Sequence, residues 1–212
     1  MANIFNRCEF LISAYTIAQL PADSGMEIAF AGRSNAGKST TINALTNNKG
    51  LAKVSKTPGR TQLFNCFEFS PGLRLVDLPG YGYAKVPIKM RKHWDQEINN
   101  YLMKRQSLIG VVIIQDIRHP MKDFDKQMIT WAFNSGMRSH VILNKCDKIN
   151  NGKIKQTLVD VKRQIKALSP TTTCQTFSAL RRVGTEELST IAKSWFTEEQ
   201  SFMDQGKEFE EE

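Results

Sequence analysis

Residues 32–39 carry the pattern that most constrains how this chain can fold. Their sequence, Gly-Arg-Ser-Asn-Ala-Gly-Lys-Ser, matches G-x-x-x-x-G-K-[ST], in which backbone N–H groups turn inward around a phosphate. The apolar run 27–32 before it is typical of a buried strand, and 38–45 begins like a helix. This order puts the phosphate at the positive end of a helix dipole. Without its flanking elements, the octapeptide is also compatible with a glycine-rich turn beside a surface lysine.

Two residues of this phosphate loop (32–39) and a second motif predict a magnesium and triphosphate site. Lys38 is expected between the β- and γ-phosphates, and the Ser39 hydroxyl on Mg²⁺. Asp77 ends the apolar run 73–77 and begins Asp-Leu-Pro-Gly. We expect Asp77 to hold Mg²⁺ through water and the Gly80 N–H to contact the γ-phosphate. Taken singly, Asp-x-Pro-Gly is an ordinary turn, so this interpretation depends on the phosphate loop.

A third motif predicts which base is bound. Asn144-Lys-Cys-Asp147, the base motif, follows the apolar run 140–144. An aspartate carboxylate accepts hydrogen bonds from guanine N1–H and the 2-amino group, whereas adenine presents an acceptor at N1. Sites built around such a pairing reject the wrong ligand by roughly 10⁴-fold or more. Asp147 therefore predicts GTP over ATP, and the Lys145 stem would lie along the base plane. An exposed polar turn is the alternative for the motif alone.

Two weaker segments complete the predicted site. Residues 178–180, Ser-Ala-Leu, follow a strand-like run and could offer a backbone N–H to guanine O6. Residues 53–62 are rich in glycine, proline and hydroxyl groups, which is typical of a mobile loop. Thr61 is the preferred candidate to close on Mg²⁺ and the γ-phosphate, with Thr57 as its competitor. The alternative is a surface connection whose threonine caps a turn.

The predicted site is thus assembled from separate parts of the chain. Lys38, Thr61 and Gly80 are predicted to be catalytic, and Ser39, Thr61 and Asp77 to hold Mg²⁺. The residues predicted to contact the nucleotide are Gly32, Arg33, Ser34, Asn35, Ala36, Gly37, Lys38, Ser39, Thr40, Gly59, Arg60, Thr61, Asp77, Leu78, Pro79, Gly80, Asn144, Lys145, Asp147, Ser178, Ala179 and Leu180.

From about residue 10 to 196, the chain resembles the EngB (YihA/YsxC) family of bacterial GTP-binding proteins. The resemblance rests on five blocks: 32–39, Lys-Thr-Pro-Gly-Arg-Thr-Gln at 56–62, Asp-Leu-Pro-Gly-Tyr-Gly-Tyr-Ala at 77–84, Lys-Arg-Gln-Ser-Leu at 104–108 and Asp-Ile-Arg-His-Pro at 116–120. It implies a Ras-like domain that binds GTP and GDP with Mg²⁺, acts on the maturing large ribosomal subunit and affects cell division and septation. The family often has threonine at the position of Asn144, where GTPases at large more commonly have asparagine.

Two positions bear on hydrolysis. Tyr81 occupies the place where Ras-type enzymes carry a glutamine that orients the attacking water, so we expect slow turnover, roughly 10⁻⁴ to 10⁻³ s⁻¹ without a partner, and stimulation by the ribosome. In GTPases that resemble this chain, a residue at the position of Asn35 can help to bind K⁺ between the α- and γ-phosphates. Hydrogen bonding within the loop is the alternative role of Asn35.

The alternation of apolar runs and helix-like segments predicts a three-layer α/β Ras-like P-loop GTPase domain. We expect a six-stranded, mostly parallel sheet in which the second strand is antiparallel to the third through a turn at 70–72. A packing segment at 1–24, the GTP-binding domain at 25–197 and an acidic, disordered tail at 198–212 are predicted. The expected strands are 27–32, 63–69, 73–77, 109–115, 140–144 and 174–178, and the expected helices are 38–47, 88–105, 121–135, 152–168 and 185–196.

Charge predicts a nucleic-acid partner. The 212 residues carry a formal charge of +8, but residues 198–212 hold seven acids and one base, so the rest is about +14. Bases gather at 49–60 and 85–93, beside the segments expected to move, which favours ribosomal RNA over charge for solubility alone. Four scattered cysteines predict reduced thiols. The uncharged stretch 10–22 is too short to span a bilayer, so we expect a cytoplasmic monomer without a membrane anchor.

Other functions use some of the same residues. A small-molecule kinase would also need the phosphate loop, but Asp147 would then have no obvious purpose. A structural RNA-binding module would tolerate loss of Lys38. A GTPase that acts in tRNA modification or at a membrane remains the nearest alternative within the GTP-binding class.

Overall fold

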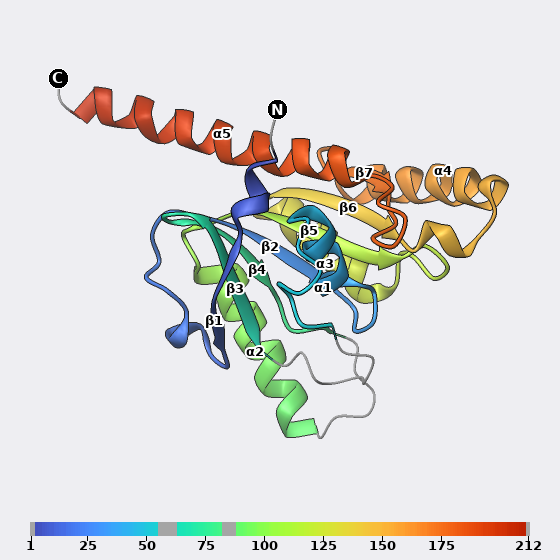
Figure 1. Ribbon diagram of the computed structural model, residues 1–212, viewed down its shortest axis with the longest axis horizontal. Helices are drawn as coiled ribbons and strands as arrows, with labels where there is room; N and C mark the ends of the chain where they lie inside the picture. Colours follow the sequence, from blue (N-terminus) through green and yellow to red (C-terminus); the bar gives the residue numbers. More distant parts are fainter. Residues whose placement is uncertain (1–2, 55–62, 82–87, 211–212) are drawn as a thin grey trace.

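A sheet with helices on both faces positions the site (Figure 1). The computed structural model describes residues 3–54, 63–81 and 88–210, the side chains of 88–95 and 205–210 excepted. In these ranges the strands are β1 (Glu9–Ala14), β2 (Met26–Gly32), β3 (Phe64–Ser70), β4 (Leu73–Asp77), β5 (Leu108–Asp116), β6 (Arg138–Asn144) and β7 (Thr173–Thr176). The α-helices there are α1 (Lys38–Leu45), α2 (Ile88–Lys104), α3 (Asp123–Asn134), α4 (Asn151–Leu168) and α5 (Thr185–Glu210), and short 3₁₀ turns cover Ile4–Arg7, Ile17–Gln19 and Cys146–Lys148.

The strand order explains why the motifs meet. Within the described residues the sheet runs β1-β3-β4-β2-β5-β6-β7, and β2 pairs in parallel with both β4 and β5. All seven residues of β2 are buried, as expected for a central strand covered on both faces. The phosphate loop, Asp77 and Asn144 follow or end β2, β4 and β6, which run parallel, so they share the edge at which ligands of such sheets bind.

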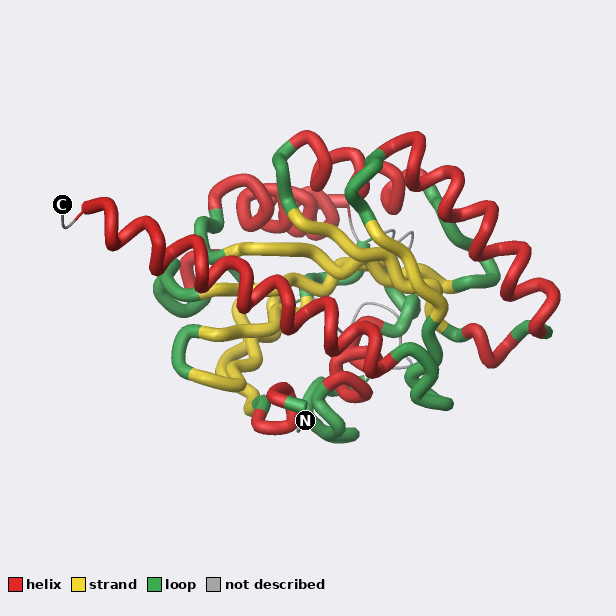
Figure 2. Tube along the Cα trace, turned by 90° about the horizontal axis from the view of Figure 1, so that it is seen from above, coloured by secondary structure: helices red, strands yellow, loops and turns green. Residues whose placement is uncertain are grey.

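Two apolar cores lie on opposite faces of the sheet. On one face, α1 and α5 pack through side chains such as Ile42, Leu45 and Trp195. On the other face, α2, α3 and α4 contribute residues such as Tyr101, Ile129 and Val161. Figure 2 shows these two helical layers on either side of the strands. The predicted three-layer α/β arrangement is therefore confirmed.

The N-terminal segment corrects the predicted strand count. Residues 1–24 were expected only to pack against the domain, but β1 pairs antiparallel with β3 and adds a seventh strand at the sheet edge. It carries a short apolar run at residues 10–12, as the central strands do, but its side chains are mostly exposed at the sheet edge. As predicted, β3 is antiparallel to β4 across the 70–72 turn, and it is the one strand of the described sheet that opposes the others in direction.

The C-terminal segment also differs from its prediction. The helix was expected to end at 196 and to give way to a disordered tail, whereas α5 continues to Glu210 and projects beyond the sheet (Figure 1). Arg138 at the start of β6 contacts the first turn of this continuation, with its guanidinium 2.6 Å from Glu199 and 3.5 Å from Glu198. The proposed domain boundary at 197 is therefore not marked by the end of a helix.

The other end of β2 carries a buried cluster of charges. Glu27 accepts a hydrogen bond from the Tyr101 hydroxyl at 2.9 Å and pairs with Arg105 at 2.7 Å and with Arg74 at 3.0 Å. These contacts join the C-terminal end of α2 to the sheet, away from the phosphate loop. Within the described residues, no helix combines the length and apolarity needed to cross a bilayer.

Candidate nucleotide site

The phosphate loop joins β2 to α1 in a conformation that depends on glycine. Gly37 has φ of +101°, and a Cβ there would lie 2.3 Å from the Asn144 side-chain nitrogen. A larger residue would therefore be strained and would push the base motif away. The Asn144 amide instead donates to the Ala36 carbonyl at 3.0 Å. The base motif and the phosphate loop are thus in direct contact, at the one sheet edge where the sequence predicted both.

Lys38, Ser39 and Asp77 meet at the start of α1. The buried Lys38 ammonium donates to the Gly32 carbonyl at 3.4 Å. The Ser39 hydroxyl donates to Asp77 Oδ2 at 2.9 Å. Burial lowers the pKa of Lys38, and the nearby Asp77 carboxylate opposes part of that decrease. Burial also raises the pKa of Asp77, and Lys38 and Ser39 oppose part of that increase. Because both charged groups are buried away from water, their electrostatic interaction with a bound phosphate or metal ion would be strong.

The same residues fit a magnesium ion. Asp77 Oδ1 is buried and has no hydrogen-bond partner among the described residues, although a buried carboxylate oxygen normally has one. Together with the Ser39 hydroxyl it supplies the hard oxygen donors that Mg²⁺ prefers, completed by water and phosphate oxygens. This orphaned acceptor beside Ser39 supports the predicted role of both residues as metal ligands.

Gly80 lies directly against the phosphate loop. A Cβ at this position would sit 3.0 Å from Lys38 Nζ and 3.1 Å from Ser34 Cα. The next residue, Tyr81, donates its backbone N–H to the Gly32 carbonyl at 3.4 Å and accepts from the Ser34 N–H at 3.1 Å. The Asp77–Gly80 motif therefore lies against the loop where the phosphates are expected, and its Leu78 side chain is buried.

Lys145 connects the base motif to two other elements. Its ammonium donates to the Asn35 carbonyl and, at 3.0 Å, to Asp116 Oδ2 at the end of β5. The residue adopts a left-handed backbone conformation with φ of +65°. Its side chain therefore spans from the base motif to the phosphate loop, which is compatible with the predicted position along a base plane.

Asp147 is held in place by the segment that follows β7. Its Oδ1 accepts from the Ser178 hydroxyl at 2.5 Å, and Lys148 contacts Oδ2 at 3.1 Å. The Ser178 hydrogen bond is the main reason that the pKa of Asp147 is lowered, so the group remains an ionised acceptor at neutral pH. The Ala179 N–H points to Asn144 Oδ1 at 3.5 Å, and Leu180 is exposed beside it. Residues 178–180 therefore adjoin the base motif as predicted.

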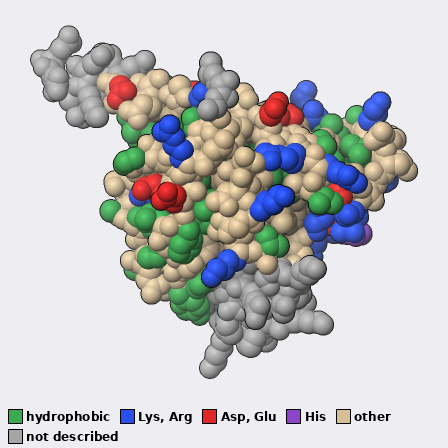
Figure 3. Space-filling model, in the orientation of Figure 1, with side chains coloured by type: hydrophobic (Ala, Val, Ile, Leu, Met, Phe, Trp, Pro, Cys, Tyr) green, Lys and Arg blue, Asp and Glu red, His purple; other side chains and the backbone are tan. Residues whose placement is uncertain are grey.

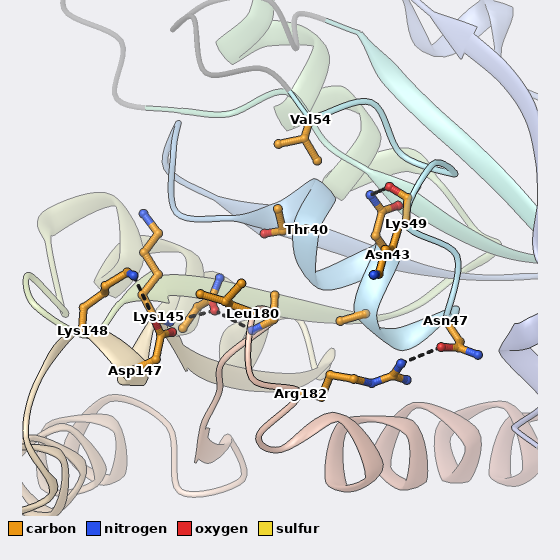
Figure 4. A pocket seen from close by; sticks show the side chains of 13 residues that line it. Thr40, Asn43, Asn47, Lys49, Val54, Lys145, Asp147, Lys148, Leu180 and Arg182 are labelled. Carbon is orange, nitrogen blue, oxygen red and sulfur yellow. Dashed lines mark hydrogen bonds and ion pairs between the residues drawn. The ribbon is translucent and has the colours of Figure 1, made fainter.

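A cavity of about 680 Å³ opens between these parts, within the range of small-molecule sites. Figure 4 shows Thr40 and Asn43 of α1 on one side, and Lys145, Asp147 and Leu180 on another. The lining residues are Thr40, Asn43, Ala44, Asn47, Lys49, Val54, Asn144, Lys145, Asp147, Lys148, Ala179, Leu180 and Arg182. The Arg182 guanidinium closes part of the rim by donating to Asn47 at 2.6 Å.

Some predicted site residues fall outside the described part of the chain. These are Thr57, Gly59, Arg60 and Thr61, so the choice between the two threonines stays a prediction. Asn35 is described, with φ of +62° and a carbonyl that accepts from Lys145. Its role toward K⁺ also stays a prediction.

Comparison with known proteins identifies the family. Residues 27–145 match the family described as "50S ribosome-binding GTPase". Over 201 residues the chain is 50% identical to the probable GTP-binding protein EngB of Escherichia coli strain K12, covering 94% of this chain and 96% of that protein. The corresponding protein of Shigella boydii serotype 18 gives the same values. The chain belongs to the EngB family of GTP-binding proteins.

Solved structures confirm the fold of this EngB-family chain. A crystal structure of a probable GTP-binding protein engB superposes with a TM-score of 0.62 at 23% identity, covering 81% of this chain and 99% of that one. A single-residue variant of Aquifex aeolicus Era bound to GDP·AlF₄⁻ gives 0.62 at 20% identity, covering 79% and 56%. At these identities the likeness shows the fold alone, which is that of α/β P-loop GTPases.

Asp116 contacts Lys145 of the base motif in this EngB-family chain, and reasoning from chemistry missed this contact. Arg118 contacts its two oxygens at 2.9 and 2.6 Å, and Lys145 shares the second. Partial burial opposes ionisation of Asp116, but the bonds from Arg118 and Lys145 outweigh it and hold its pKa well below the usual range. The sequence does carry a signal for this residue, because Asp116 follows an apolar run just as Asp77 does.

Proposed function

We propose that this EngB-family protein is a GTP-driven switch that hydrolyses GTP slowly and acts in assembly of the large ribosomal subunit, with a link to cell division and septation. The observation that carries the proposal is the direct connection between base motif and phosphate loop. Asn144 bonds to the Ala36 carbonyl, and Lys145 to the Asn35 carbonyl. A guanine on Asp147 and a triphosphate on the loop would therefore be bound by one connected framework.

Guanine selectivity follows from the state of Asp147. The carboxylate is oriented by Ser178 and kept ionised, so it offers acceptors to N1–H and the 2-amino group of guanine. Adenine would leave that acceptor facing another acceptor, a mismatch that such sites reject by roughly 10⁴-fold. Membership in a GTP-binding family favours this function over a small-molecule kinase.

Several residues of this chain would share the binding of the phosphates and the metal ion. Ser39 and Asp77 would hold Mg²⁺, which neutralises phosphate charge when bound. Lys38 would donate to the β- and γ-phosphates, and the Gly80 N–H to the γ-phosphate alone. Thr61, outside the described residues, would complete the metal site after GTP binds. The nucleotide thereby determines which chain segments are held near the loop.

Slow hydrolysis is supported by the position of Tyr81. Its hydroxyl lies 2.9 Å from Asp125 at the start of α3, so it is turned into the core and occupied there. A side chain in this position does not orient a water at the γ-phosphate, and turnover of the free protein would stay near roughly 10⁻⁴ to 10⁻³ s⁻¹. The bound ribosomal particle would supply what accelerates the reaction.

The proposed partner is ribosomal RNA of the large-subunit precursor. On the face drawn in Figure 3, lysine and arginine side chains are most numerous toward the right of the view. The exposed basic residues Lys49, Lys148 and Arg182 line the nucleotide cavity, and the exposed Lys53 and Arg181 are each next in sequence to a lining residue. A phosphate backbone is the partner that such a rim would attract, with affinity that falls as salt rises. We place this activity in the cytoplasm, with the protein acting as a monomer.

Substitution of Asp147→Asn tests the base assignment. The asparagine amide would donate to the 2-keto oxygen of xanthine, so binding should change from guanine to xanthine nucleotides when both are titrated into nucleotide-stripped protein. Asp160→Asn, at a partly exposed residue of α4, is the matched control and should keep guanine preference. Unchanged guanine affinity in Asp147→Asn would rule out Asp147 as the base-reading residue.

Cosedimentation tests the ribosomal part. The full chain is mixed with large-subunit precursor particles in the presence of GDP or a slowly hydrolysed GTP analogue, at several salt concentrations. We expect binding to particles with the GTP analogue and weaker binding with GDP, decreasing with salt. Equal, salt-independent recovery with both nucleotides would contradict a nucleotide-controlled RNA interaction.

A further inference from the structure

Tyr81 is attached to two parts of the protein at once. Its hydroxyl donates to Asp125 Oδ1 at 2.9 Å, and its ring lies 5.7 Å from that of Phe124. Its backbone makes the two hydrogen bonds to Gly32 and Ser34 described above. The residue therefore links the phosphate loop, through its main chain, to the start of α3, through its side chain.

Asp125 is built to receive this bond. It is buried, and its second oxygen accepts from the Lys122 N–H at 3.1 Å, at the N-terminus of α3. Both carboxylate oxygens are thus committed, one to the helix and one to the tyrosine. Burial and Asp125 together raise the pKa of Tyr81 well above its ordinary value, so the hydroxyl keeps the proton that it donates.

The consequence falls on Gly80, the residue before Tyr81. Gly80 packs against Lys38 and Ser34 so closely that a Cβ would require its neighbours to shift, and Tyr81 restrains the chain immediately after it. We propose that Tyr81 and Asp125 are positioning residues that keep the Gly80 amide beside the phosphate loop and thereby favour triphosphate over diphosphate. This inference rests on the proposed function, in which Gly80 contacts the γ-phosphate.

The direction of the effect follows from which ligand uses the amide. GTP would contact both the loop and Gly80, whereas GDP has no γ-phosphate to reach it. If the tyrosine bond is lost, Gly80 populates other positions, and the apparent affinity for GTP falls by the fraction that leaves. GDP affinity is unaffected by that population. Loss of a buried hydrogen bond to a carboxylate corresponds to roughly tenfold in such an equilibrium.

The chain contains a matched control for this bond. Tyr101 is also buried and also donates to a buried carboxylate, Glu27, at 2.9 Å. That pair lies at the opposite end of β2 from the phosphate loop. Tyr101→Phe therefore removes the same chemical group from the same kind of environment without touching Gly80.

The experiment measures affinities of the full, nucleotide-stripped chain for GDP and for a non-hydrolysable GTP analogue, with Mg²⁺, alongside thermal unfolding. For Tyr81→Phe we expect GDP affinity near that of wild type and a GTP-analogue-to-GDP affinity ratio that is lower by up to roughly tenfold. Asp125→Asn replaces the charged acceptor by a neutral amide, whose bond to the tyrosine hydroxyl is weaker, and should lower the ratio in the same direction but by less. Tyr101→Phe should lower the unfolding temperature but keep the wild-type ratio.

Two results would overturn the inference. One is a ratio that is the same in wild type, Tyr81→Phe and Asp125→Asn; the other is an equal loss of ratio in Tyr101→Phe. If Tyr81→Phe does not fold, Asp125→Asn decides by the same ratio. If the wild-type protein binds neither guanine nucleotide, the proposed function is refuted. That result is distinguishable from a refutation of this inference, which requires binding with an unchanged ratio.

Discussion

Acidification should destabilise this protein through one buried histidine. His140 on β6 lies between Thr173 and Gln175 of β7, with its Nδ1 2.7 Å from the threonine hydroxyl and its Nε2 2.9 Å from the glutamine oxygen. Since that oxygen only accepts, Nε2 carries the proton, and Nδ1 accepts from Thr173. Burial lowers the pKa of His140 from 6.5 to about 4, despite the opposing bond to Gln175. The native protein therefore holds this ring neutral.

The size of the effect follows from the two pKa values. Above pH 6.5 the ring is neutral in both states and contributes no pH dependence. Below 6.5 the unfolded chain binds a proton that the native state does not bind until about pH 4, so stability is lost as pH falls through that window. Linkage gives a loss of about 2 kcal/mol at pH 5 and about 3 kcal/mol below pH 4.

Urea unfolding at pH 7.5 and pH 5 measures this loss. His140→Gln keeps a donor and an acceptor but removes the titrating ring, and His119→Gln, at an exposed position, is the matched control. Between the two pH values, wild type and His119→Gln should each lose about 2 kcal/mol more unfolding free energy than His140→Gln. All other titrating groups cancel in that comparison. An equal loss in wild type and His140→Gln would refute the reasoning.

Three further predictions concern the nucleotide. Asp116→Ala removes an acceptor of the Lys145 ammonium and should weaken fluorescent GDP binding roughly tenfold; affinity equal to that of the surface variant Asp160→Ala would contradict this. Gly80→Ala places a methyl group 3.0 Å from Lys38 Nζ and should weaken a GTP analogue more than GDP, whereas equal weakening would show that Gly80 does not face the γ-phosphate. Hydrolysis should be faster in K⁺ than in Na⁺ at fixed ionic strength if Asn35 binds K⁺, and equal rates would remove that role.

The central part of the fold was accessible from the sequence because its strands are buried on both faces. β2, β4, β5 and β6 appear as continuous apolar runs, and each lies within two residues of its predicted bounds. The edge strand β1 was missed for a different reason: its short apolar run at 10–12 is equally compatible with a packing segment, and the strand is defined by pairing with β3, fifty or more residues away along the chain.

The C-terminal helix shows how composition alone misleads. Seven acids among the last fifteen residues predicted disorder. The ion pairs from Arg138 to Glu198 and Glu199 join residues far apart in the chain, so a local sequence pattern does not predict them. They lie just beyond Phe196, the last buried residue of the described helix side chains.

The motif residues of the site were predictable, and their supporting partners were not. Residues such as Lys38, Asp77 and Asp147 belong to short patterns with a chemical meaning of their own. Asp116 and Asp125 gain their roles only from the side chains that the fold brings to them. Tyr81 lies between these cases. The sequence indicated that it cannot orient the attacking water as a glutamine would, but not that its hydroxyl bonds to Asp125 of α3.

Calorimetry with nucleotide-stripped protein tests the central claim most directly. GTP and ATP are titrated separately in the presence of Mg²⁺ into the full chain. Because the ionised Asp147 pairs with guanine and opposes adenine, we predict that GTP binds more tightly by roughly 10⁴-fold or more. ATP binding of comparable affinity would contradict the account.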